Sequence, residues 1–333
     1  MGALARAHLL EPLTNDALGH VLPPISFIIA GFMKCGTTSI AMALDSHPDC
    51  CHSIPKETHF FTHNYGRGFD WFRGTMAGYA GEPVIGESSM SYTLTPWTAD
   101  AGERIYDHNP EIKLIFALRD PVERLVSGWK MARSRSGSSA HAAALRGFEH
   151  YVLRTEPRHP ESAAWLEPLI EFGPAVDPSR TRVELNLSLY RRQIALYQQR
   201  FSSENIAFIC LERWQANPQL EARRLCEFLE LDPDRLPPID TAGSNRADQR
   251  RTRNELANRL SNWRLTGALR RAMPDSISAR LASSEILTTP EKHPDPQLDS
   301  AFGRSLRAFL QTESEPLLAE LGMPSDLWSY GAV

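Results

Sequence analysis

A chain of 333 residues is long enough to bury a large hydrophobic core, in one big α/β domain or in two smaller ones. Its apolar fraction of 42% and charged fraction of 23% are those of a water-soluble globular protein, and no apolar run is long enough to span a membrane. The formal net charge of −4 argues against bulk electrostatic binding to nucleic acid or to a membrane surface.

The N-terminal residues 1–24 are predicted to be a lead-in that contains a short helix. Their apolar stretch is too short, and their first acidic residue comes too early, for a secretory signal peptide. The cysteines are odd in number and lack the spacing of metal-binding pairs: Cys35, Cys50, Cys51, Cys210 and Cys226. We therefore expect reduced thiols and a cytoplasmic protein.

The stretch 25–44 reads I-S-F-I-I-A-G-F-M-K-C-G-T-T-S-I-A-M-A-L and predicts a buried strand, a glycine loop and the start of a helix. The free N–H groups of a helix N-terminus attract anions, and the ammonium of Lys34 and the neighbouring hydroxyls add further donors. The sequence thus predicts a phosphate-type site made of Lys34, Cys35, Gly36, Thr37, Thr38 and Ser39.

The position of the lysine separates two kinds of phosphate loop. A nucleotide-hydrolysing P-loop reads G-x-x-x-x-G-K-[ST]. Here Gly31 and Gly36 keep the glycine spacing, but Thr37 takes the place of the lysine and Lys34 lies inside the loop. The loop alone also leaves open an ordinary glycine turn with a solvated lysine.

The segment 55–61 reads P-K-E-T-H-F-F and is predicted to be extended. Alternation would place Glu57 and His59 on one face and anchor Phe60 on the other. A carboxylate and an imidazole on one face are candidates for proton transfer, and the alternative is a surface Glu beside a His at the edge of the core. Further along, 83–92 (P-V-I-G-E-S-S-M-S-Y) predicts a second strand that runs into a polar turn.

The stretch 113–129 predicts another buried strand followed by a strongly specified helix. Asp120 stands at the N-cap position, with Pro121 at N1 and Glu123 at N3. Arg119 at the end of the strand and Ser127 two turns into the helix then converge at the edge of the sheet where α/β proteins bind ligands. An arginine fork suits a phosphate. Two other readings are a plain capped helix and a strand whose Asp120 holds Mg²⁺, although an N-capping Asp beside an Arg is poorly available to a metal.

The rest of the sequence, from residue 130, predicts an irregular insertion followed by further helices and a strand. Residues 130–180 are polar, rich in proline and irregular, as in a lid or substrate loop or in a solvated insertion. A helix is expected from Asn186, then a strand at 206–211, a helix as far as Leu229, an arginine-rich surface at 246–271 and a pair of amphipathic helices at 298–321.

The K-C-G-T-T-S loop, the E-x-H-F-F segment and the L-R-D-P-x-x-R-x-x-S motif together resemble the sulfotransferases that use 3′-phosphoadenosine 5′-phosphosulfate (PAPS). The pattern is closest to the glycan-directed, heparan sulfate branch, in a soluble member of bacterial type. The resemblance runs from about Phe27 to Trp328. It implies one α/β domain over residues 25–328, with a central parallel β-sheet flanked by helices as in P-loop nucleotide kinases, and with 130–180 as an insertion.

The resemblance also implies roles for the motif residues. The loop from Lys34 to Ser39 would grip the 5′-phosphosulfate, and Arg119 and Ser127 would hold the 3′-phosphate. Glu57 would be the general base of an in-line transfer, Lys34 would stabilise charge on the leaving phosphate oxygen, and His59 would assist. No metal is expected, because the loop already supplies the cations.

Two segments depart from the family pattern. Ser88 stands where the family's G-E-K-[ST]-P-x-Y segment has a lysine that helps orient the acceptor. The late segment 288–294 keeps the His-Pro of the family's K-G-R loop but lacks those three residues, and Lys292 is the substitute we expect. These departures affect the acceptor contacts and the closure over the nucleotide.

The acceptor is expected to be a hydroxyl or amine of a glycan, a lipid or a small metabolite. The expected partners are this acceptor and, as an option, a second copy of the chain, without nucleic acid or stable membrane insertion. Two alternative functions remain at this stage: a kinase that uses ATP and Mg²⁺, and a catalytically inactive protein that binds a nucleotide or a sulfated ligand.

Overall fold

The computed structural model describes residues 23–94, 98, 100–134, 146–153, 183–239, 251–253, 288–290 and 295–331. The predictions for residues 1–22, for most of the insertion at 130–180, for most of the arginine-rich stretch and for Lys292 concern residues outside these ranges. They stay predictions, as does the domain division at residues 24 and 25.

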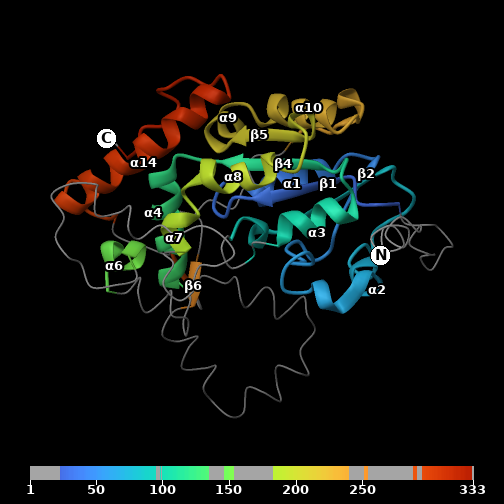
Figure 1. Cartoon of the computed structure of the whole chain (residues 1–333), viewed down its shortest axis with the longest axis horizontal. Helices are drawn as coiled ribbons and strands as arrows, with labels where there is room; N and C mark the ends of the chain where they lie inside the picture. Colours follow the sequence, from blue (N-terminus) through green and yellow to red (C-terminus); the bar gives the residue numbers. More distant parts are fainter. Residues whose placement is uncertain are drawn as a thin grey trace, which may run out of the picture.

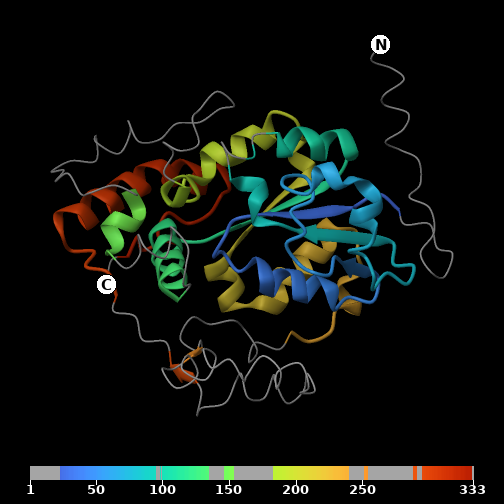
Figure 2. The same ribbon diagram turned by 90° about the horizontal axis from the view of Figure 1, so that it is seen from below.

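A parallel five-stranded sheet lies at the centre of the described residues, in the order β2-β3-β1-β4-β5. The strands are β1 (Phe27–Gly31), β2 (Cys50–His52), β3 (Val84–Ser88), β4 (Lys113–Leu118) and β5 (Ile206–Cys210). β1 is buried along its whole length because β3 and β4 flank it within the sheet and helices cover the sheet on both faces (Figure 1, Figure 2). The predicted fold class is confirmed.

Helices cover both faces of this sheet, with α1 and α10 on one face and α3 and α8 on the other (Figure 1, Figure 2). The longer helices are α1 (Thr37–Asp45), α3 (Ala101–His108), α4 (Pro121–Ser134), α8 (Tyr190–Gln198), α10 (Pro218–Phe228) and α14 (Ala301–Glu320). The short ones are α2 (Gly68–Arg73), α6 (Phe148–Leu153), α7 (Val183–Asn186) and α9 (Leu211–Ala216). None of the helices described is both long enough and apolar enough to cross a bilayer.

The C-terminal part is one helix and not the predicted pair. α14 packs against α4 and α8, and its buried stripe continues past Pro316 from Leu310 to Leu317. Ser300 caps its start by accepting a hydrogen bond from the Gly303 N–H at 3.1 Å. The apolar face at helical spacing therefore outweighs the tendency of Pro316 to break a helix.

Two short strands lie apart from the main sheet. β6 (Arg251–Arg253) pairs antiparallel with β7 (Thr288–Pro290). The start of the predicted late loop at 288–294 is thus a strand, paired with part of the arginine-rich stretch.

The packing between β1 and β3 depends on a glycine. Phe27 is fully buried and stands opposite Gly86 in the parallel register. A Cβ at Gly86 would lie 2.0 Å from Cζ of the Phe27 ring, so the ring occupies the space that any larger residue would need. This close approach sets the spacing of the two strands that lead into the candidate site.

We expect Gly86→Ala to destabilise the protein by about 1–3 kcal/mol, because the added methyl overpacks a core that cannot yield. Denaturant unfolding followed by circular dichroism measures this loss. Gly66→Ala is the matched control, since no atom lies within 4 Å of a Cβ at Gly66, and we expect it to change stability by less than about 0.5 kcal/mol. Equal effects of the two substitutions would contradict the packing described.

Candidate nucleotide and acceptor site

The loop from Gly31 to Gly36 joins β1 to α1 in the conformation that an anion cradle requires. The Phe32 N–H donates to the Ala117 carbonyl of β4 at 2.9 Å, which ties the loop to the sheet. Lys34 (φ +72°) and Gly36 (φ +86°) both lie in the left-handed region. A Cβ at Gly36 would also lie 2.7 Å from Cδ1 of Leu211, so glycine is needed there for two reasons.

The N-terminus of α1 is open to an anion. No side chain caps it and its first turn carries no acidic residue. The first N–H groups of a helix have no partner within the helix, and they carry the positive end of its dipole. Thr38 and Ser39 in this turn are half-buried, and Thr37 Oγ1 accepts a hydrogen bond from Lys56 Nζ at 3.3 Å. The predicted strand–loop–helix geometry is therefore present.

The side chain of Cys35 points into the core and not toward the loop's ligand side. It is fully buried, and its Sγ lies 3.6 Å from the hydroxyl of Tyr190. Burial raises the pKa of the Cys35 thiol to about 11, so the thiol is neutral. Any contact that Cys35 makes with an anion is through its backbone.

Tyr190 connects the loop to the second predicted motif. Its hydroxyl donates to the backbone carbonyl of Arg119 at 2.8 Å and faces the Cys35 thiol. Because β1 and β4 are parallel neighbours, their carboxyl ends lie at one edge of the sheet. The structure thus brings together the K-C-G-T-T-S loop and Arg119, as predicted.

Asp120 caps α4 as the sequence predicts. Its Oδ1 accepts hydrogen bonds from the N–H groups of Val122 (2.9 Å) and Glu123 (3.2 Å). Its Oδ2 accepts one from the Tyr330 N–H at 2.6 Å, which attaches the C-terminal segment to the site. Both oxygens of this carboxylate are therefore engaged by protein donors, which is the role of a cap and not of a metal ligand.

One face of α4 lies against the loop. Residues four positions apart share a helix face, and Glu123, Ser127 and Met131 are spaced in this way. At one end of this face Glu123 pairs with Arg119 (3.2 Å), and at the other Met131 Sδ lies 3.8 Å from Lys34 Nζ. The half-buried Ser127 therefore lies between the two predicted phosphate-binding cations.

The segment that carries Glu57 and His59 is not extended. Both residues adopt left-handed backbone angles, φ +69° at Glu57 and +52° at His59, so the alternation argument was wrong. Each such angle costs about 1–3 kcal/mol at a residue other than glycine. Phe60 is fully buried and anchors the segment, as predicted.

The polar atoms of both predicted catalytic side chains face the turn that follows β3. Glu57 Oε2 accepts a hydrogen bond from the Met90 N–H at 2.8 Å, and its Oε1 lies 2.5 Å from Lys56 Nζ. His59 Nδ1 is 2.8 Å from Ser91 Oγ. Burial lowers the pKa of His59, which favours the neutral imidazole. The two side chains thus contact neighbouring residues of one turn.

Lys56 connects this segment to the loop, because its ammonium contacts both Glu57 and Thr37. The three predicted motifs are therefore joined, the loop to Arg119 through Tyr190 and the loop to Glu57 through Lys56. The contacts of Lys56 with Thr37 and of Tyr190 with Arg119 were not predicted, since neither is visible in a local pattern.

Sequence reasoning also missed a buried carboxyl group behind the segment. Glu87 on β3 is fully buried and accepts hydrogen bonds from the hydroxyls of Thr58, Ser89 and Tyr92. Strand alternation would have found it, because Ile85 and Glu87 share the core face of β3.

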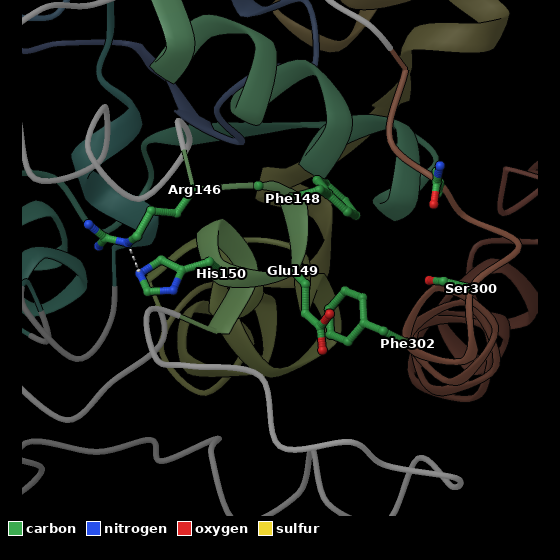
Figure 3. Close-up of a pocket in the computed structure, with 8 residues that line it drawn as sticks. Arg146, Phe148, Glu149, His150, Ser300 and Phe302 are labelled. Carbon is green, nitrogen blue, oxygen red and sulfur yellow. Dashed lines mark hydrogen bonds between the residues drawn. The ribbon is translucent and has the colours of Figure 1, made fainter.

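A separate hollow of about 470 Å³ lies around α6, away from these motifs. It is lined by Arg146, Gly147, Phe148, Glu149, His150, Gln297, Ser300 and Phe302. In Figure 3 the Arg146 side chain points toward His150, and its Nε is 2.8 Å from Nε2 of the imidazole. None of the predicted site residues lines this hollow.

Comparison with known proteins identifies the family. The model of the sulfotransferase domain matches residues 24–259, more than half of the chain. The chain belongs to the sulfotransferase family. This assignment agrees with the parallel sheet, the anion loop and the position of Arg119.

Named relatives extend the comparison. Heparan sulfate glucosamine 3-O-sulfotransferase 6 of Mus musculus is 28% identical over 204 residues, which cover 61% of this chain and 52% of that protein. The membrane-associated sulfotransferase kil1 of Dictyostelium discoideum is 31% identical over 137 residues, which cover 40% of this chain and 28% of that protein. A crystal structure of a sulfotransferase from Alicyclobacillus acidocaldarius is 24% identical, with a TM-score of 0.49, and covers 72% of this chain and 91% of that one. The chain spans about half the length of the heparan sulfate relative.

Proposed function

We propose that this sulfotransferase family member transfers the sulfuryl group of PAPS to a hydroxyl or amine of an acceptor. The observation that carries the proposal is the open N-terminus of α1 with Lys34, joined through Tyr190 to Arg119. Two separate cationic ends on one sheet edge suit a nucleotide that carries anionic groups at both its 5′ and 3′ positions.

The residues present fit such a nucleotide. The first turn of α1 has no acidic residue to repel a phosphosulfate. Arg119 is only partly exposed and is paired with Glu123, whose own side chain is 43% exposed. This carboxylate can turn to solvent when the guanidinium takes up a 3′-phosphate, and Ser127 would add a hydroxyl one turn further along α4.

The proposed reaction exchanges one bond to sulfur for another and moves one proton to a side chain of the site. The acceptor oxygen or nitrogen forms a bond to sulfur while the bond from sulfur to the 5′-phosphate oxygen breaks. Glu57 takes the acceptor proton, and Lys34 with the loop N–H groups stabilises the charge that develops on the leaving oxygen. His59, favoured in its neutral form by burial, positions the acceptor or shares its proton.

The names of the relatives support a proposal for the class of acceptor. Curated relatives are named as heparan sulfate glucosamine 3-O-sulfotransferases, which favours the hydroxyl of a glycan, with a lipid-linked sugar or small metabolite as the alternative. Location in the cytoplasm and assembly with a second copy stay predictions of the sequence.

A magnesium-dependent kinase is the competing enzyme class. It would need a carboxylate at the end of β4 to hold the metal, and Asp120 there is engaged by three backbone N–H groups. The other competitor, an inactive binding protein, shares every feature of the nucleotide site and differs only in turnover.

Arg119→Ala should weaken the binding of the product nucleotide, 3′-phosphoadenosine 5′-phosphate (PAP), by about 10- to 100-fold, since a charged hydrogen-bond donor to the 3′-phosphate is lost. Adenosine 5′-phosphosulfate, which has no 3′-phosphate, should bind about equally to the wild type and to Arg119→Ala. Calorimetry without Mg²⁺ measures both affinities. Arg191→Ala, on α8 and paired with Glu320 at the surface, is the control. Binding of ATP that requires Mg²⁺, without binding of PAP, would favour the kinase.

Lys34→Ala should lower the turnover number by about 10²- to 10³-fold with a smaller effect on nucleotide affinity, because its charge is most useful when the leaving oxygen becomes negative. Steady-state kinetics with labelled PAPS and calorimetry with PAP separate the two effects. Lys130→Ala removes a lysine of α4 that pairs with the exposed Asp295 and should leave both unchanged. Equal losses in turnover and affinity would mean that Lys34 binds the nucleotide without specifically stabilising the transition state.

Glu57→Gln keeps the shape of the side chain and removes its basicity. PAP binding should survive while transfer falls by about 10²- to 10⁴-fold, and His59→Ala should be milder. The measurement is the rate of sulfuryl transfer to each of a panel of candidate acceptors. The control is Glu103→Gln, at an exposed position of α3. A nearly active Glu57→Gln beside a dead His59→Ala would assign the base to the imidazole. PAP binding by a wild type that transfers to no acceptor would favour the binding-protein alternative.

A further inference from the structure

The backbone that carries the proposed base is held in an unfavourable shape. Glu57 and His59 are both left-handed although neither is glycine, and only Thr58 separates them. Such angles persist only where the surroundings determine them, and they cluster where a side chain must be aimed. Something behind this segment must therefore hold it.

Three consecutive backbone N–H groups of the segment are bound by hydroxyls. His59 N–H donates to Ser89 Oγ (2.9 Å), Phe60 N–H to Thr58 Oγ1 (3.2 Å) and Phe61 N–H to Tyr92 OH (3.4 Å). The Glu57 N–H is held separately by the Ser88 carbonyl at 2.8 Å. The Thr58 hydroxyl binds locally, two residues along the chain, but the hydroxyls of Ser89 and Tyr92 come from the turn after β3, so a local turn alone does not account for the pattern.

All three hydroxyls then donate to one carboxyl group. Glu87 Oε1 accepts from Ser89 Oγ at 2.8 Å, from Thr58 Oγ1 at 3.0 Å and from the Tyr92 hydroxyl. A hydroxyl that accepts from an N–H keeps its single hydrogen available to donate, and each of these three directs it to Glu87 Oε1. An ionised carboxylate has no hydrogen to donate, so it can accept from all three hydroxyls. Glu87 is fully buried, so water does not take its place as their acceptor.

We propose that Glu87 is a positioning residue that fixes, through the hydroxyls of Thr58, Ser89 and Tyr92, the backbone on which Glu57 and His59 stand. We call these four residues, Glu87 and its three hydroxyl donors, the hydroxyl hub. The proposal rests on the function proposed above for Glu57, and Glu87 acts on the reaction only through that segment.

The hub needs the ionised form of Glu87, and this makes it sensitive to pH. Burial raises the pKa of Glu87 to about 7, against the lowering effect of its three hydroxyl donors. Within the hub, Tyr92 is itself titratable. Beside the hub lies Glu57, whose negative charge raises the pKa of Glu87 further. On α3, Arg104 and His108 contact Phe61. Protonation removes the charge that the three donors share, and a hydrogen on Oε2 would meet the Ser89 hydroxyl, which lies 3.2 Å away and itself donates to the carboxyl group. The complete hub is therefore present above about pH 7 and is lost as the pH falls through that value.

Glu87→Gln replaces the charged acceptor shared by three donors with a neutral amide oxygen, and its amide N–H₂ at the place of Oε2 would face the Ser89 hydroxyl, which lies 3.2 Å from Oε2. We expect the turnover number to fall by about tenfold or more, as misplaced groups do, while the PAP dissociation constant and the KM for PAPS stay within about threefold. The acid-side inflection near pH 7 in the wild-type turnover profile should be absent. Glu221→Gln, a buried carboxyl of α10 paired with Arg213 and Arg224, is the matched control and should keep the inflection. A Glu87→Gln profile that keeps the inflection would overturn the proposal.

Tyr92→Phe tests the hub without touching the carboxyl group. Removing one donor destabilises the ionised form, so the acid-side inflection should move to higher pH. Tyr151→Phe removes the hydroxyl of a tyrosine that is equally buried on α6 and should leave the inflection in place. This variant also carries the test if Glu87→Gln does not fold. An unmoved inflection in Tyr92→Phe contradicts the hub.

Hydrogen exchange measured by mass spectrometry gives a readout that does not depend on activity. Amides of the peptide 57–63 should exchange faster in Glu87→Gln and Tyr92→Phe than in the wild type, after correction for intrinsic rates, while the peptide that spans 31–39 should not change. Unchanged exchange in 57–63 would overturn the hub whatever the kinetics show. Faster exchange in a protein that transfers no sulfuryl group would instead overturn the proposed function and leave Glu87 as a purely structural anchor, without the role proposed here.

Discussion

The parallel pairing of β1 with β3 and β4 is the constraint on which the site depends. It places the carboxyl ends of three neighbouring strands at one edge, so that the anion loop, the turn after Ser88 and Arg119 start from adjacent positions. The packing of Phe27 on Gly86 keeps two of these strands in register. Side-chain contacts then add precision, through Tyr190 between loop and arginine and through Lys56 between loop and Glu57.

The geometry of the half of the site that is proposed to bind the sulfuryl donor, the loop after β1 and the start of α4, could be predicted because its signals are local. A buried apolar run, two glycines and a run of hydroxyls specify strand, loop and helix within twenty residues. The cap of α4 is equally local, since Asp120 reaches N–H groups only two and three positions away. Convergence of the two motifs required only the rule that parallel strands deliver their ends to one edge.

The geometry of the half that is proposed to meet the acceptor, the E-x-H-F-F segment and the turn after β3, could not be predicted in the same way, because tertiary contacts override its local pattern. The E-x-H-F-F segment looks extended by alternation, yet its N–H groups are taken by hydroxyls from elsewhere and its backbone turns left-handed twice. A similar override keeps α14 whole across Pro316. The buried Glu87 was visible as a core-facing position of β3, but the three donors that make burial tolerable come together only in the fold.

The two halves also differ in how they follow the family pattern. The glycine loop keeps its lysine, whereas Ser88 stands where the family resemblance places a lysine near the acceptor. Ser88 is buried, and among the described residues its Oγ has no hydrogen-bond partner, so it does not take over that contact. The cation that stands nearest to Glu57 is instead Lys56, from the same segment. Lys56 contacts both Glu57, the proposed base, and Thr37, so it would be less available to an acceptor than a lysine on the facing turn. The proposed function therefore predicts that an acceptor is selected by shape and neutral hydrogen bonds more than by this charge.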